Sequence, residues 1–337
     1  MKIFAQPHFV EFKKMQVKVM NKLLYIGFIL FFLFSFGSCK KNKPKDKWDD
    51  TLYTGIIKVA CDENFSYLME AEIASFEANS NYQATIFPVY SNESEVINMM
   101  LDDSVRLVLT TRKLNSLEQR TVKEKKMFVR ENLIAYEGIS LIINKANQDS
   151  LIGIPTLRKI LLGEITEWSQ INPESPLGTI RVIFDSNRSG TLRYIVDSIA
   201  KTTNLSSNLY AMQSSEELIE KVCQLPNAIG IVGYNIIINK DNWRIPDLQN
   251  KLRLMRVGKE ENANLQNTFY PFVGDIKSED YPLWRAIYIL LSDPRSGLSS
   301  GFSIFLANDI GQTVILKSGL FPAVTDPYNR SVYVTPK

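Results

Sequence analysis

The stretch DSNRSGTLRY, residues 185–194, joins an apolar run to an amphipathic one. The apolar run, residues 180–184, is rich in β-branched side chains and predicts a buried strand. After the stretch, apolar residues recur at helical spacing, at Leu192, Ile195, Val196 and Ile199. The sequence therefore predicts a strand, a tight turn and a helix in succession.

The turn has the residue types that suit an anion. Ser189 and Thr191 fit the N-cap and first turn of the helix, and Gly190 lets a ligand approach the backbone. The first N–H groups of a helix have no partner within it and lie at the positive end of its dipole. Arg188 and Arg193 add positive charge nearby. An ordinary capped helix without a ligand also fits these ten residues.

Length and composition describe a globular chain with little net charge. The 337 residues, 45% of them hydrophobic, can form two lobes with their own cores. Residues 1–38 hold five lysines and one acid; removing these from 39 basic and 36 acidic residues leaves 34 and 35. Nucleic-acid binding needs a concentrated basic surface, so this balance argues against it.

The first residues predict export. Lysines precede the apolar run 23–36, and Gly37 and Ser38 precede Cys39, which indicates a signal peptide over residues 1–38. The ending resembles a bacterial lipobox, so we expect lipidation of Cys39 and a tether over residues 39–54. The chain would then be anchored to a bacterial membrane, facing the periplasm or the cell exterior. An uncleaved transmembrane helix and a true start at Met20 are the alternatives.

Histidine and cysteine content narrows the chemistry. The only histidine, His8, lies in the predicted signal, so the mature chain would lack Ser-His-Asp and Cys-His machinery and any histidine-ligated metal site. We therefore expect a protein that is not an enzyme and has neither cofactor nor metal. Cys61 and Cys223 are far apart in sequence, and we expect two separately buried thiols rather than a disulfide.

Strands and helices alternate through the first half of the chain. This pattern predicts an α/β protein with a mostly parallel sheet and helices on its faces. In such sheets ligands lie beyond the carboxyl ends of the strands. Three turns should meet there: residues 64–66, residues 92–94 and Thr111 with Arg112. A long strand over residues 133–144, broken at Gly138, should pass from one lobe to the other, and residues 286–291 should cross back.

Four motifs then carry a resemblance to a known family. They are Ser189-Gly190-Thr191, the segment from Leu157 through Ile160, Gly163 and Ile165 to Trp168, the strand Ala228-Ile229-Gly230, and Gly311-Gln312 with Gly319-Leu320 and Pro322. In this order and spacing, over about residues 55–325, the chain resembles the phosphate-binding lipoproteins of phosphate ABC importers.

The resemblance implies a two-lobed periplasmic binding protein-like type II fold, with mixed, mostly parallel sheets. Lobe 1 would be residues 55–137 plus 282–337 and lobe 2 residues 138–281, with phosphate or a similar oxyanion in the cleft between them. Such lobes close by hinge motion around the ligand. It also implies a monomer that delivers its ligand to an ABC permease without catalysis.

Carried over position by position, the family's ligand residues fall on Asn64, Phe65, Ser189, Gly190 and Thr191. Two positions differ: the family often has arginine where this chain has Asp185, and Ser-Asp where it has Thr111-Arg112.

Our hypothesis is that the charged pair is exchanged, so that Arg112 supplies donors and Asp185 an acceptor. An acceptor favours an anion that still carries a proton, which separates phosphate from sulfate. If neither side chain reaches the cleft, the site is altered or lost. Glu93 and Ser94 fit the second-strand position about equally well, and a carboxylate there would weaken anion binding.

Two other functions remain open at this point. The same scaffold could serve a sensing or interaction protein with a different or lost ligand. A hydrolase using Ser189 is disfavoured, because no histidine could act as its base.

Overall fold

The computed structural model describes residues 50–79, 81–238 and 248–324. The predicted signal peptide, Cys39 and the tether up to residue 49 lie outside the described residues. Within the described part of the chain, no helix has both the length and the apolar character needed to cross a bilayer.

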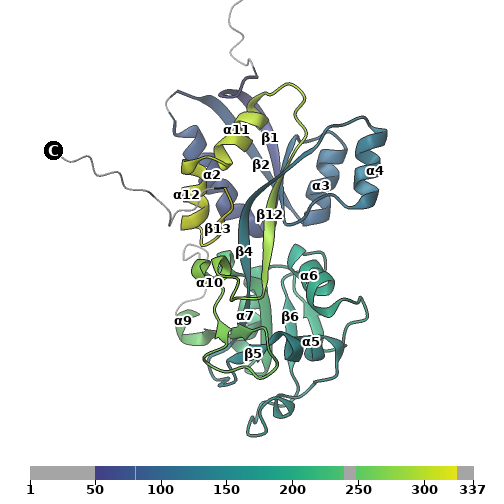
Figure 1. The fold of residues 1–337 in the computed structure, drawn as a ribbon, viewed down its shortest axis with the longest axis vertical. Helices are drawn as coiled ribbons and strands as arrows, with labels where there is room; N and C mark the ends of the chain where they lie inside the picture. Colours follow the sequence, from purple (N-terminus) through teal and green to yellow (C-terminus); the bar gives the residue numbers. More distant parts are fainter. Residues whose placement is uncertain (1–49, 80, 239–247, 325–337) are drawn as a thin grey trace, which may run out of the picture. The chain divides into compact units, whose positions relative to one another are not determined.

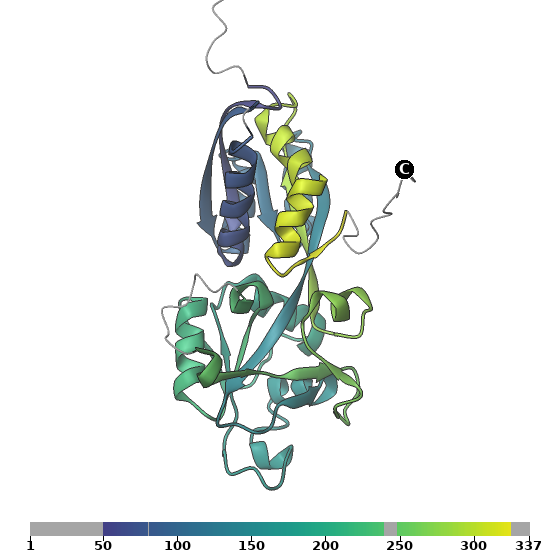
Figure 2. The same cartoon turned by 90° about the vertical axis from the view of Figure 1, so that its left-hand side faces the viewer.

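The first core group is built on three parallel strands. The central strand is β1 (Thr54–Asp62), which pairs with β2 (Gln83–Ser91) on one side and β3 (Leu107–Thr110) on the other. Helices cover both faces: α2 (Ser66–Glu77), α11 (Leu298–Leu306) and α12 (Asp309–Lys317) on one, and α3 (Glu93–Leu101) with α4 (Ser116–Glu124) on the other. Figure 2 shows α2 and α12 side by side.

The second core group repeats this plan. Strand β6 (Arg181–Phe184) lies parallel between β8 (Ala228–Gly233) and β7 (Leu209–Ala211). Its main helices are α5 (Ile154–Leu162), α6 (Gly190–Tyr194), α7 (Ser215–Gln224) and α8 (Tyr234–Ile238). The smaller elements are β5 (Leu151–Gly153), α9 (Leu248–Lys251), β9 (Leu252–Leu254), β10 (Arg256–Gly258), β11 (Thr268–Phe269) and α10 (Val273–Lys277).

Two long strands belong to both groups. Strand β4 (Arg130–Asn144) pairs antiparallel with β12 (Trp284–Leu291), and in this register Arg285 lies opposite Glu137. Figure 1 shows the two strands running together from one core group to the other. Strand β12 also pairs with β3 and β4 with β8, which joins the strands in the order β2-β1-β3-β12-β4-β8-β6-β7. The short β13 (Phe321–Pro322) also pairs with β4.

Each group has its own apolar core. In the first, Phe76 meets Phe302 and Phe305 edge-on, with ring centroids 5.3 and 5.2 Å apart. In the second, Trp168 is 1% exposed and packs among the aliphatic side chains of α5 and β6. Burial of one such side chain stabilises the fold by about 1.5–3 kcal/mol. These two cores fix the elements that present the polar residues described below.

The predicted fold class, a mixed α/β fold with helices on both faces of the sheet, is confirmed. The expected thiols are confirmed too: Cys61 and Cys223 are free, although Cys223 is only half-buried. One helix departs from expectation, because after Tyr194 the chain continues as a π-helix, Ile195–Ala200. Helix α4 and the short strands β5, β7, β9, β10 and β11 were not predicted, since they are short or mostly polar and show no apolar period.

Candidate functional site

The turn after β1 is held against the second core group by the side chain and carbonyl of Asn64. Its Nδ2 donates to Asp185 Oδ2 at 3.0 Å, and its Oδ1 accepts from Ser215 Oγ at 3.2 Å. Asn235 Nδ2 donates to the Asn64 carbonyl at 2.7 Å. Three segments of the second group therefore meet this one turn, and Asn64 is only 6% exposed.

The turn that begins α6 forms as its sequence predicts. Ser189 is the N-cap, and its Oγ accepts from the Leu192 N–H at 3.1 Å. Gly190 and Thr191 in the first turn are buried. The turn after β3 also reaches this place, because a Cβ built on Gly190 would lie 2.8 Å from Thr111 Oγ1. The turns after β1, β3 and β6 therefore come together here.

Two charged side chains lie close to the Cβ position of Gly190. The same Cβ position lies 3.0 Å from Arg285 Nη1 and 3.2 Å from Asp62 Oδ2. Arg285 comes from β12 and Asp62 from the end of β1, so they reach Gly190 from different strands. Any side chain at position 190 would collide with these groups, which explains why glycine is needed here.

We call Asp62, Glu137, Thr191 and Arg285 the inner cluster; each is at most 3% exposed. Arg285 Nε and Nη2 both lie 2.7 Å from Glu137 Oε2. Among the described residues, Glu137 Oε1 has no hydrogen-bond partner, and Arg285 Nη2 meets Glu137 only as an ion pair. Three further atoms have no hydrogen-bond partner there: Arg285 Nη1, Asp62 Oδ2 and Thr191 Oγ1. Buried polar atoms are usually paired, so these three indicate a place where something else binds.

Burial dominates the electrostatics of the inner cluster. It raises the pKa of Asp62 from 3.8 to about 7, against the lowering effect of Arg285. Burial also raises the pKa of Glu137, again opposed by Arg285. Burial alone would lower the pKa of Arg285, but Glu137 and Asp62 outweigh it and hold the guanidinium charged.

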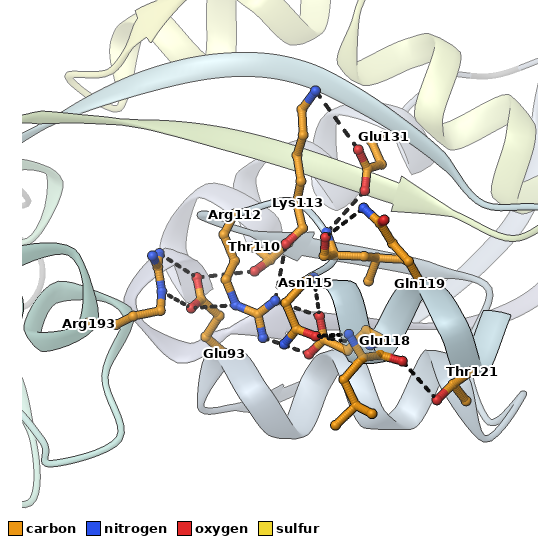
Figure 3. Close-up of polar contacts among 12 residues, drawn as sticks. Glu93, Thr110, Arg112, Lys113, Asn115, Glu118, Gln119, Thr121, Glu131 and Arg193 are labelled. Atoms are coloured by element: carbon orange, nitrogen blue, oxygen red, sulfur yellow. Dashed lines mark hydrogen bonds and ion pairs between the residues drawn. The ribbon is translucent and has the colours of Figure 1, made fainter. Parts of the chain in front are cut away.

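A second set, the outer chain, consists of Glu93, Arg112, Glu118 and Arg193 (Figure 3). Arg112 Nη1 and Nη2 donate to the two oxygens of Glu118 at 2.7 and 2.8 Å, and its Nε lies 3.3 Å from Glu93 Oε2. From the other core group, Arg193 Nε donates to Glu93 Oε2 at 2.5 Å. The outer chain is thus an alternating row of charges that joins the two groups.

Glu93 is the centre of the outer chain. Asn92 caps α3, which places Glu93 in the first turn, buried, while Ser94 is exposed. Glu93 accepts from the backbone N–H and the hydroxyl of Thr111. Burial alone would raise the pKa of Glu93, but the charge and hydrogen bonds of Arg193, with that of Thr111, hold it below its usual value. Of the two residues left open by the sequence, Glu93 faces the junction.

The structure places the two members of the hypothetical exchanged pair with different partners. Arg112 belongs to the outer chain. Asp185, 3% exposed, accepts from the Ser186 N–H at Oδ1 and from Asn64 at Oδ2. Burial raises the pKa of Asp185, opposed first by hydrogen bonds from Ser189 and Asn64. Phe65 is buried with its ring 5.6 Å from the Arg285 guanidinium carbon.

Sequence reasoning overlooked Arg285 and Glu137. The sequence held a signal for both: Arg285 is the single charge in the otherwise apolar strand β12, and Glu137 lies in β4 just before a long apolar run. Charged residues are seldom fully buried unless they are paired. It also overlooked Ser215 and Asn235, whose roles depend on how the second core group folds. Within the residues described, no cluster of three His, Cys, Asp or Glu side chains could hold a metal ion.

Comparison with known proteins identifies the family. A family model described as PBP superfamily domain matches residues 49–309, well over half of the chain. The chain belongs to this family, the PBP superfamily domain.

Relatives of this PBP superfamily chain carry phosphate-binding names. It is 22% identical over 287 residues to phosphate-binding protein PstS of Borreliella burgdorferi, covering 83% of this chain and 91% of that one. It is also 22% identical over 231 residues to phosphate-binding protein PstS of Staphylococcus saprophyticus, covering 68% of each.

Solved structures show the same fold. A Clostridium perfringens protein, described as a phosphate ABC transporter substrate-binding protein with bound phosphate, matches with a TM-score of 0.65 and 19% identity. The match covers 80% of this chain and all of that one. An ABC-type phosphate transport receptor of Vibrio cholerae matches with a TM-score of 0.60 and 17% identity, at the same coverage.

Proposed function

We propose that this protein binds inorganic phosphate or a similar oxyanion outside the cytoplasm and delivers it to an ABC importer, without catalysis. The observation that supports this most is Arg285 Nη1, which is buried beside the first turn of α6 and has no hydrogen-bond partner within the described ranges of the chain. The relatives named for phosphate binding support the same ligand class. The lipid anchor at Cys39 remains part of this proposal.

The chemistry at Gly190 suits an oxyanion. A guanidinium N–H, the Thr191 hydroxyl and the first-turn N–H groups of a helix are all donors, and a charged donor makes the strongest hydrogen bonds to phosphate. In a place hidden from water, these bonds are weakened little by the solvent. Asn64, Phe65, Thr111 and Ser189 complete the proposed site around them.

The proposed lobes are residues 55–137 with 282–337, and residues 138–281. In this proposal each lobe is built around one of the two core groups, and the residues of the site come from both lobes. Opening of the lobes would separate Asn64 from Asp185 and Arg193 from Glu93. The donors at Gly190 would then be exposed to an arriving anion. The anion would then favour closure, because it binds groups from both sides at once.

A sensing or interaction protein without an anion is the second candidate. It is favoured by Asp185, whose carboxylate already accepts hydrogen bonds beside the α6 turn. A permanent carboxylate at that place could stand in for a bound anion.

Gly190→Ala tests the proposal, because the added methyl group would occupy the point shared by Thr111, Arg285 and Asp62. Calorimetric titration of the purified chain with inorganic phosphate should give heat of binding, and the variant should lose it. Gly274→Ala is the matched control, since a Cβ there meets nothing within 4 Å. A wild-type chain that binds neither phosphate nor sulfate would favour the second candidate.

A further inference from the structure

We infer that Arg285, and not Arg112, supplies the charged donor that binds the oxyanion, and that Asp62, and not Asp185, supplies the acceptor. This inference rests on the proposed function and assigns the two charged roles within that site.

The hydrogen-bonding capacity of the two arginines differs. Arg112 uses Nη1 and Nη2 on Glu118, Nη1 also on the Lys113 carbonyl, and Nε on Glu93. Arg285 uses Nε and Nη2 on Glu137 and leaves Nη1 without a partner among the described residues. Of these two arginines, Arg285 has a whole terminal NH₂ group free of partners among the described residues, whereas every guanidinium nitrogen of Arg112 already contacts an acceptor.

Their positions differ in the same sense. Arg285 Nη1 lies 3.0 Å from the Cβ position of Gly190. This is the turn where the resemblance to phosphate-binding proteins and the residue types both indicate the anion. Arg112 instead points toward the start of α4, where Asn115 and Glu118 form a capping box. The β12 strand thus delivers a charge to the site from inside the fold, where water does not compete for it.

The two aspartates also differ in whether their carboxylate oxygens already accept hydrogen bonds. Both Asp185 oxygens already accept, from the Ser186 N–H and from Asn64 Nδ2. Asp62 uses Oδ1 to accept from the Asn64 N–H at 3.1 Å, and its Oδ2 has no partner among the described residues. This oxygen and Arg285 Nη1 lie 3.2 and 3.0 Å from the same Cβ position of Gly190. A ligand that carries a proton could therefore donate to the oxygen and accept from the guanidinium group.

Calorimetric titration of the purified chain with inorganic phosphate tests the arginine assignment. Removal of Arg285 alone would leave Glu137 buried and unpaired, so the test variant is Arg285→Met with Glu137→Gln. We expect it to weaken phosphate binding by about 100-fold or more, as for loss of a buried charged donor. Arg112→Met should weaken it by less than about 10-fold. Arg181→Met, an exposed arginine on β6, is the control for loss of one positive charge.

Circular dichroism and thermal unfolding establish that each variant is folded; if the double variant is not, Arg285→Lys replaces it. Lysine keeps the charge but loses the fork of donors, and we expect an affinity loss there that Arg112→Lys does not show. Phosphate binding that survives in the Arg285 variants but is abolished by Arg112→Met would overturn the arginine assignment while leaving the proposed function intact. A wild-type chain that binds no oxyanion would overturn both.

Competition with sulfate tests the acceptor. Asp62→Asn replaces the free carboxylate oxygen by an amide, which no longer repels a fully ionised anion. We expect the preference for phosphate over sulfate to fall by about 10-fold or more. If Asp185→Asn lowers this preference and Asp62→Asn leaves it unchanged, the assignment to Asp62 is wrong.

Discussion

The inner cluster and the outer chain are both made of arginines and carboxylates at one junction, yet they differ in how completely they are paired. In the outer chain, the Arg112 and Arg193 side chains are 16% and 30% exposed, and both guanidinium groups donate to carboxylates. In the inner cluster, Arg285 and Glu137 are almost wholly buried, and all four members keep an atom without a hydrogen-bond partner in the part of the chain that the structure describes.

This difference distinguishes charged groups that only stabilise the fold from charged groups that can bind a ligand. A paired, partly exposed charge contributes little to stability, about 1 kcal/mol or less, and needs no further explanation. A buried polar atom without a partner costs about 1–3 kcal/mol, and it persists where another requirement outweighs the cost. Unused bonding capacity that several elements bring to one turn, rather than charge alone, therefore marks the place where a ligand is expected.

The largest expected effect comes from breaking the inner pair. Arg285→Met should lower the free energy of unfolding by about 3–5 kcal/mol, because Glu137 would be left buried without its partner. Arg285→Met combined with Glu137→Met should recover most of this loss. Urea unfolding of the two variants measures the difference. Equal losses in the single and double variants would show that the pair itself, and not the unpaired charge, governs stability.

Glu72 on α2 is also a buried carboxylate, but unlike Glu137 it has no ion pair with an arginine among the described residues. It is 0% exposed, neither oxygen has a hydrogen-bond partner among the described residues, and burial raises its pKa from 4.5 to about 9. Between these pH values folding takes up a proton at Glu72, so stability falls as pH rises. From pH 5 to pH 7 this loss should be about 3 kcal/mol.

Glu72→Gln removes the ionisable group and should remove that part of the pH dependence. Urea unfolding of wild type and variant at pH 5 and pH 7 isolates it, because the other titrating groups are common to both. A difference between the two proteins that does not grow with pH would contradict a raised pKa at Glu72.

The smallest effect is expected in the outer chain. Arg112→Met should lower the free energy of unfolding by only about 1 kcal/mol, since the pair is partly exposed and Glu118 can be hydrated once its partner is gone. The expected loss should shrink further at high salt, which screens exposed pairs. A loss as large as that of Arg285→Met would remove the distinction between the two sets.

Much of the fold could be predicted from the sequence, because its signals are local. For helix α5 these signals are the apolar residues of positions 154–162 and the glycine that follows, and Gly163 adopts the left-handed φ of 78° that favours glycine. The Ser189 cap was likewise predicted from residue type and spacing. Helix α4 was missed because its sequence is mostly polar and it buries only Glu118.

The site could be predicted only as far as its turns. Ser189, Gly190 and Asn64 lie at the ends of predicted elements, so strand order alone brings them together. Which arginine reaches them depends on strand register, since Arg285 meets Glu137 only through the pairing of β12 with β4, far apart in sequence. A charge inside an apolar strand was a usable signal for Arg285, but its direction could not be obtained without the sheet.

A crystal structure of the chain grown with arsenate, a heavier analogue of phosphate, tests the central claim most directly. We expect an anomalous peak at the first turn of α6, within hydrogen-bond distance of Arg285 Nη1 and the Thr191 hydroxyl. A peak beside Arg112 or Arg188 instead, or no bound anion at saturating arsenate, would contradict it.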